Sequence, residues 1–115
     1  MQDYEDLVFA YEVDVQYPHV SGMEHLDMLL TRSRLAEVAS DLTKEQRNRL
    51  AKADQILFRH ATEFYAAIAR IANLKRWREQ EHAPPDHWWW YLDVLAAAPR
   101  PEGSRPDAVR ELVPA

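Results

Sequence analysis

Two short spacings in this chain match the chemistry of carboxylate-bridged metal sites. Glu79 and His82 form a Glu-x-x-His pair, and His60 with Glu63 repeats the pair in reverse order. Residues three apart share a helical face, so a carboxylate and an imidazole could hold one ion. Such sites also need inward carboxylates from other helices, and the helix expected over residues 43–74 offers only Asp54 near its apolar face. We therefore predict no metal or cofactor, a boundary role for His60, and pairing of Asp54 with an arginine of a neighbouring helix.

A second spacing concerns arginine and histidine. Arg76 and His82 stand in an R-x5-H arrangement, which resembles the short motif of HEPN-type ribonucleases, helical proteins in which an arginine and a histidine from two subunits face an RNA phosphate. The resemblance covers residues 76–82 alone. It departs from the family pattern because Trp77 replaces the usual polar residue and Pro84 follows closely. It implies ribonuclease activity with Arg76 and His82 as the catalytic pair, which is kept as the alternative function beside a metal-binding helical bundle.

The run Trp88-Trp89-Trp90-Tyr91 is the most unusual stretch of the sequence. Consecutive residues of an α-helix are about 100° apart, so at least one of the three indoles is expected to face away from a common core. One interpretation buries the rings against other helices and Trp77. Another makes them an interface, because tryptophan is enriched among the residues that dominate binding energy.

Charge argues against nucleic acid as a partner. Lys75, Arg76 and Arg78 could combine with the tryptophans as a stacking platform for single strands, but the formal net charge of −5 is unsuited to a phosphate-binding surface. Residues 1–31 contain seven acids and no Lys or Arg. This segment is expected either to lie on a basic surface of its own or a sister chain, or to be solvated.

Composition fits one domain. A chain of 115 residues with 47% hydrophobic residues can form a core without disulfides. The lack of cysteine excludes thiolate metal sites and thiol nucleophiles and suits a reducing compartment, so a cytoplasmic location is predicted. Two glycines exclude glycine-rich phosphate loops. The N-terminus is acidic where a signal peptide is basic, and no apolar run approaches the ~20 residues that span a bilayer, so no membrane association is expected.

A long helix over residues 43–74 is expected to organise the rest of the chain. Its apolar residues recur at helical spacing, and they are Leu50, Ala53, Leu57, Ala61, Phe64, Ile68 and Ile71. Thr43 and Gln46 have the form of a capping box. Lys75 would fall on the apolar face, so an end or bend is predicted near residues 73–75, with a continuous helix up to at least Ile71.

A shorter helix is predicted over residues 23–40, after a cap near Ser21, and forms an antiparallel hairpin with the long helix. It carries two apolar seams. One contains Met28, Thr31, Leu35, Val38 and Leu42, and the other contains Met23, Leu26, Leu30 and Ser33. The long helix can cover one seam, so the other needs a further element or a second subunit. A third helix is predicted over residues 86–98, which Pro99 ends.

The N-terminal segment shows alternation. Phe9, Tyr11, Val13, Val15 and Tyr17 occupy alternate positions, with polar residues between the last four. Although the i,i+4 spacing of a helix is also present, the alternation favours an extended strand or arm over residues 9–17. A single strand lacks a partner within the chain, so it is expected to pair with a copy of itself or to lie across the helices.

The sequence thus predicts a mainly α protein, with a helical domain over residues 1–99, an N-terminal arm over 1–20 and a flexible proline-rich tail over 100–115. No catalytic motif is specific. We predict a non-enzymatic protein–protein interaction module, an adaptor, inhibitor or regulator, that forms homo-oligomers and binds another protein. The residues expected at the interface are Leu26, Leu30, Trp77, Trp88, Trp89, Trp90, Tyr11 and Val13.

Overall fold

Six α-helices and two short 3-10 helices make up the part of the chain that the computed structural model describes, residues 4–97, and no strand occurs there. The α-helices are α1 (Glu5–Asp14), α2 (Gly22–Glu37), α3 (Lys44–Arg59), α4 (Ala61–Ala69), α5 (Leu74–Gln80) and α6 (Leu92–Ala97), and the 3-10 helices are η1 (Ala39–Asp41) and η2 (Trp88–Tyr91). The mainly α class is confirmed. The proline-rich tail predicted over residues 100–115 lies outside the described residues.

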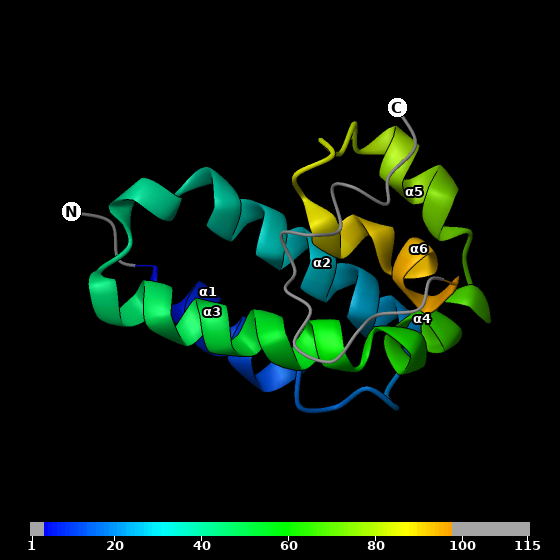
Figure 1. Ribbon diagram of the computed structural model, residues 1–115, viewed down its shortest axis with the longest axis horizontal. Helices are drawn as coiled ribbons and strands as arrows, with labels where there is room; N and C mark the ends of the chain where they lie inside the picture. Colours follow the sequence, from blue (N-terminus) through cyan, green and yellow to red (C-terminus); the bar gives the residue numbers. More distant parts are fainter. Residues whose placement is uncertain (1–3, 98–115) are drawn as a thin grey trace.

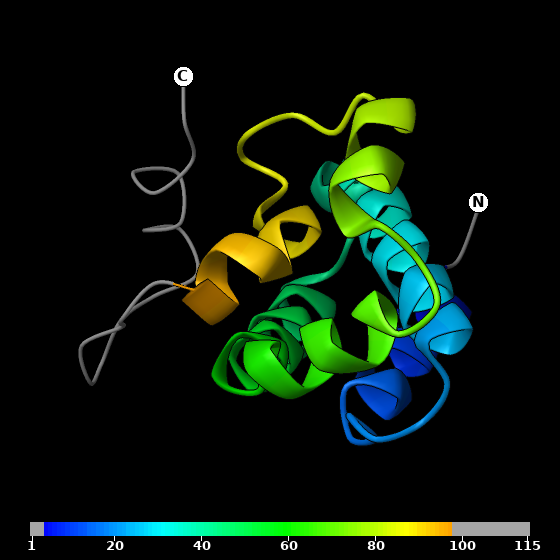
Figure 2. The same ribbon diagram turned by 90° about the vertical axis from the view of Figure 1, so that its right-hand side faces the viewer.

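Helices α2 and α3 run in opposite directions and are joined through η1 (Figure 1). Helix α1 packs against both of them, and α4 packs against α2 and α6. Helix α5 contacts η2, which also contacts α2. Figure 2 shows α5 at the upper right and α6 lower down on the left, with the loop after residue 80 and η2 between them. Both predicted seams of α2 therefore have members buried within one chain, Leu35 in one and Leu26 in the other, although Met23 is 52% exposed.

The strand predicted over residues 9–17 is wrong, because residues 9–14 belong to helix α1 and the following residues form a turn. Two sets of side chains explain the error. The buried set is Val8, Tyr11 and Val15, and the exposed set is Phe9, Val13 and Tyr17. Each set follows helical spacing on one side of α1. Because most members of both sets fall at odd positions, together they imitate the alternation of a strand.

The long helix predicted over residues 43–74 is divided into two helices, α3 and α4. The chain leaves helical geometry at His60, with φ −105° and ψ 23°, and α4 ends at Ala69, so the predicted continuity to Ile71 is wrong. The bend lets α3 pack on α1 while α4 packs on α2 and α6. The core assignment holds on both sides of the bend, since Leu57 and Phe64 are 0% exposed, but Ile71 is 51% exposed.

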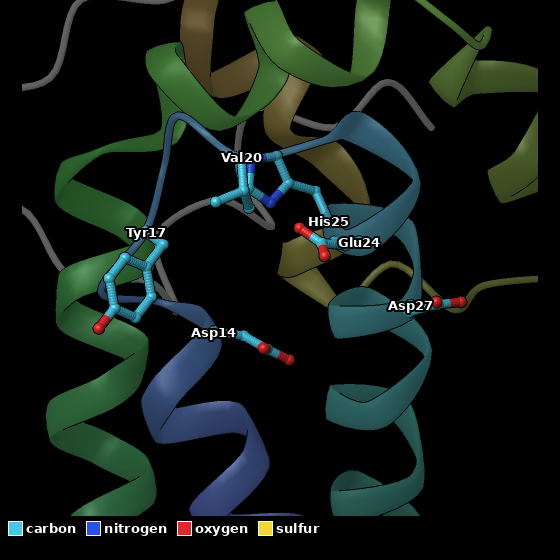
Figure 3. A pocket seen from close by; sticks show the side chains of 6 residues that line it. All are labelled: Asp14, Tyr17, Val20, Glu24, His25 and Asp27. Carbon is cyan, nitrogen blue, oxygen red and sulfur yellow. The ribbon is translucent and has the colours of Figure 1, made fainter.

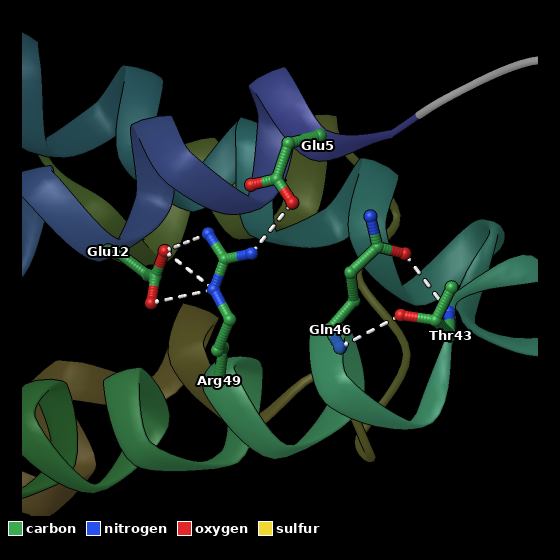
Figure 4. A network of polar contacts seen from close by, with 5 residues as sticks. All are labelled: Glu5, Glu12, Thr43, Gln46 and Arg49. Atoms are coloured by element: carbon green, nitrogen blue, oxygen red, sulfur yellow. Dashed lines mark hydrogen bonds and ion pairs between the residues drawn. The ribbon is translucent and has the colours of Figure 1, made fainter.

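Helix starts follow the local sequence. The Ser21 hydroxyl accepts a hydrogen bond from the backbone N–H of Met23 at 3.2 Å. At the start of α3, the backbone N–H of Gln46 donates to the Thr43 hydroxyl, and the Gln46 side chain accepts from the Thr43 backbone N–H, as predicted (Figure 4). Asn73 caps α5 by accepting from the backbone N–H of Arg76, which accounts for the break predicted near residues 73–75.

The third helix predicted over residues 86–98 starts as the 3-10 helix η2 and continues as α6. Trp88, Trp89 and Trp90 are 6%, 2% and 1% exposed, so the expectation that one of them faces away from the core is wrong. A 3-10 helix has three residues per turn and spreads successive side chains by about 120°. All three rings are buried because η2 packs against α2, α5 and α6. In addition, the Phe58 ring of α3 contacts the Trp88 ring edge to face.

Candidate functional site

A buried polar network fixes α1 on the bundle. The carboxylate of Asp54 on α3 accepts a hydrogen bond from the Tyr11 hydroxyl at 2.6 Å. It also accepts from Arg32 of α2 through Nε at 2.8 Å and Nη2 at 3.0 Å. The predicted pairing of Asp54 with an arginine of a neighbouring helix is confirmed. Burial raises the pKa of the Tyr11 phenol, and the negative charge of Asp54 raises it further.

Arg32 connects this network to the tryptophans. The Arg32 guanidinium lies 4.1 Å from the centre of the Trp89 ring. The next residue of α2, Ser33, accepts the indole N–H of Trp89 at 3.0 Å and that of Trp90 at 2.8 Å. These contacts hold the tryptophans inside the chain, where they stabilise the fold.

Arg78 of α5 is also occupied within the chain. Its guanidinium donates to the backbone carbonyl of Trp90 at 2.8 Å and to the Asp93 carboxylate at 2.7 Å, and it lies 4.2 Å from the centre of the Tyr91 ring. With the three indoles buried as well, Arg78 and these rings do not form an exposed stacking surface.

The residues expected at an interface differ in exposure. Those fully or largely buried are Tyr11, Leu26, Trp88, Trp89 and Trp90. Leu30 and Trp77 are partly buried against the core, whereas Val13 is 38% exposed. The interface assignment stays a prediction, and Val13 is its most exposed member.

Val13 belongs to a row of exposed apolar side chains that we call the apolar stripe, made of Phe9, Val13 and Tyr17. Phe9 is 61% exposed and Tyr17 is 57% exposed. Phe9 and Val13 are four residues apart on α1 and therefore share one side of it, and Tyr17, four positions further on, lies in the turn that follows the helix. Phe9 and Tyr17 were missed as site residues, although their i,i+4 relation to Val13 is visible in the sequence.

One edge of α1 is tied to α3 by Arg49. Its Nη1 donates to Glu5 at 2.7 Å, and its Nε donates to Glu12 at 3.1 Å (Figure 4). Hydrogen bonding to Arg49 lowers the pKa of the Glu5 carboxyl. The acidic N-terminal segment therefore lies on a basic residue of its own chain, which is one of the arrangements expected from the charge distribution.

Beyond the end of α1 lies a cavity of about 550 Å³, which we call the acidic pocket. It is lined by Asp14, Tyr17, Val20, Glu24, His25 and Asp27 (Figure 3). Asp14 comes from α1 and Glu24 and Asp27 from α2, and Figure 3 shows the carboxylates of Asp14 and Glu24 facing the space while that of Asp27 points away from it. Partial burial raises the pKa of the Asp14 carboxyl, and the charges of Glu24 and Asp27 raise it further.

His25 holds the turn that shapes this pocket. It is 1% exposed, and its Nε2 donates to the carbonyl oxygen of Pro18 at 3.0 Å. Its ring meets Phe64 edge to face with centroids 4.6 Å apart. Burial lowers the pKa of His25, so the imidazole is held neutral as a structural donor.

The residues of the enzyme and metal hypotheses lie elsewhere. Arg76 and His82 are exposed, and neither lines the acidic pocket. His82 has a φ of 52°, which takes it out of the helical register of Glu79. His60 and Glu63 form a surface pair with 3.4 Å between Nδ1 and Oε2. Within residues 4–97, no three side chains of the His, Cys, Asp and Glu types are grouped so that they could hold a metal ion.

Comparisons with protein-family models, curated proteins and solved structures find no match to this chain. Over the described residues, none of the helices has both the length and the apolar character needed to cross a lipid bilayer.

Proposed function

We propose that this protein is a non-enzymatic interaction module that binds another protein through the apolar stripe. The supporting observation is that α1 is apolar on both sides. Its inner side is in the core, while Phe9 on the outer side is 61% exposed, and Tyr17 in the turn after the helix is 57% exposed. Exposed apolar patches of this kind mark binding surfaces, and aromatic side chains supply much of the binding energy at such surfaces.

The fixed position of α1 adds to this support. The Tyr11–Asp54–Arg32 network holds its inner side, and Arg49 holds one edge through Glu5 and Glu12. A surface that is already ordered loses little conformational entropy when a partner binds, so more of the contact energy contributes to affinity.

A homo-oligomer was predicted because three surfaces were expected to lack cover within one chain: the second seam of α2, the tryptophans and the N-terminal segment. Leu26 of that seam is 1% exposed, and the tryptophans are buried within one chain. Met23 of that seam, which is 52% exposed, and the outer side of α1 stay uncovered. The proposal therefore places a different protein, and not a second copy, on the apolar stripe.

Comparative co-purification from the source cells tests the proposal. The tagged wild type is compared with Phe9→Ser/Val13→Ser and with the control Ile71→Ser, which removes a 51% exposed apolar residue outside α1. We expect at least one protein to be retained by the wild type and the control but lost by the stripe variant. Thermal unfolding checks that the variants stay folded, since exposed substitutions change stability by about 0.5 kcal/mol or less. Equal recovery of all proteins with the stripe variant would refute the proposal.

A further inference from the structure

The apolar stripe ends in the acidic pocket, and the two surfaces share Tyr17. Tyr17 is the last residue of the stripe, and its side chain lines the pocket (Figure 3). Val20, which is 39% exposed, also lines the pocket. Asp14 projects from the end of α1 toward the side of α2 that carries Glu24 (Figure 3). A segment that contacts the stripe as far as Tyr17 would therefore bring its end to the pocket that Asp14 and Glu24 line.

Among residues 4–97, no lysine or arginine balances the acidic side chains of this pocket. Glu5 and Glu12 share Arg49, but Asp14, Glu24 and Asp27 form no ion pair with any lysine or arginine of the described residues. Burial is the main cause of the raised pKa of Asp14, and the negative charges of Glu24 and Asp27 add to it. The described residues up to position 31 also contain no Lys or Arg. The potential around the pocket is therefore negative.

We propose that the partner on the apolar stripe is a basic amphipathic helix, whose apolar face lies along Phe9, Val13 and Tyr17 and whose lysine or arginine side chains enter the acidic pocket. This inference rests on the proposed function and adds the chemistry of the partner. The stripe spans about two helical turns, or about 12 Å. An aromatic ring beside carboxylates suits a cationic side chain with an apolar stem, because the stem packs on the ring while the charge meets the acids.

Charge also distinguishes this partner from a second copy. A two-fold contact through the stripe would set the acidic pocket and α1 of one chain close to the same acidic elements of the other. Like charges opposed across an interface disfavour association. A helix rich in lysine or arginine removes the unbalanced charge, and electrostatic attraction raises its rate of association.

Peptide titration of the full chain tests the inference. The probe is a synthetic peptide of about 15 residues, with leucine at every third or fourth position and lysine elsewhere, and a matched peptide replaces each lysine by glutamate. Amide chemical shifts of the ¹⁵N-labelled protein report where each peptide binds, and the titration gives Kd. The pocket variant is Asp14→Asn/Glu24→Gln/Asp27→Asn. The control variant Asp41→Asn/Glu81→Gln/Asp86→Asn removes the same charge from exposed acids elsewhere.

We expect the lysine peptide to shift amides of α1, of the following turn and of the start of α2. The pocket variant should weaken its binding at least about tenfold at low salt, the control variant by no more than about twofold, and about 0.5 M salt should abolish most of the difference. Equal binding of the glutamate peptide, equal weakening by both variants, shifts confined to other helices, or no binding of the lysine peptide would each overturn the inference.

The same titration distinguishes an error about the chemistry of the partner from an error about the interaction surface itself. If Phe9→Ser/Val13→Ser weakens both peptides while the pocket variant has no effect, the stripe binds helices and only the basic chemistry of the partner is wrong. If the partner lost in the co-purification experiment carries no basic amphipathic segment, the inference falls and the interaction surface stands.

Discussion

Removal of the Asp54 carboxylate should destabilise this fold more than any other single charge change among residues 4–97. Asp54→Ala leaves the Tyr11 hydroxyl and two N–H groups of Arg32 without their acceptor. The Arg32 side chain is only 11% exposed, and its Nη1 is already buried without a hydrogen-bond partner, so water cannot easily replace the carboxylate. Removing one partner of a buried ion pair costs about 3–5 kcal/mol. That is a large part of the 5–15 kcal/mol that typically stabilises a domain.

Urea unfolding followed by tryptophan fluorescence measures the loss, since all three clustered indoles are buried. Asp41→Ala is the control because Asp41 is exposed and should change stability by about 0.5 kcal/mol or less. The double variant Arg32→Met/Asp54→Leu removes both charges and should recover much of the loss, because no unpaired charge is then buried. A loss below about 1 kcal/mol in Asp54→Ala, or a double variant as unstable as the sum of the single variants, would refute the buried-charge explanation.

Three further predictions concern the core. Gly22→Ala should lower the free energy of unfolding by about 1–3 kcal/mol, because its Cβ would lie 2.5 Å from a backbone carbonyl oxygen of α4; a variant as stable as wild type would exclude this close approach. Leu57→Ala and Phe64→Ala should each lower the free energy of unfolding by about 2–5 kcal/mol, whereas unchanged denaturant midpoints would show that these apolar residues of α3 and α4 are not part of the core. Burial lowers the pKa of His25 below 6.5. The contribution of the neutral His25 to the free energy of unfolding is therefore fully present above pH 6.5 and is lost as the pH falls toward the lower folded-state pKa. His25→Gln should reduce this dependence and leave the part due to His87, whose pKa burial also lowers; an unchanged pH profile would count against a neutral buried His25.

The features that the sequence predicts well depend on neighbouring residues or on charge pairing. The Thr43 capping box and the Ser21 cap need only groups within three positions, and both form. The pairing of Asp54 could be predicted because a carboxylate within an apolar arc requires a buried cation or donor. Which arginine supplies it could not, because Arg32 reaches Asp54 only after α2 and α3 have packed with α1.

The errors arise where tertiary packing selects between local alternatives. The sequence has no glycine or proline at His60 that would predict the bend there. The bend allows α3 and α4 to pack against different helices. The tryptophans were expected to exceed what one core could hold, but that expectation assumed a regular α-helix. A 3-10 helix surrounded by neighbours accommodates all three, and Ser33 satisfies two of their N–H groups at once.

The candidate site shows why exposure was the hardest property to predict. A strand over residues 9–17 would have placed Phe9, Tyr11 and Val13 on one side, whereas the helix separates Tyr11 from the other two and sends it to Asp54. The inward side of α1 is required by the fold, because Val8, Tyr11 and Val15 have no exposed surface. The outward side is not, since a helix that only covers a core usually carries polar residues toward solvent. Exposed Phe9 on this outward side and exposed Tyr17 in the following turn, near carboxylates that form no ion pair within residues 4–97, are therefore better explained by a contact with another molecule than by the stability of this one.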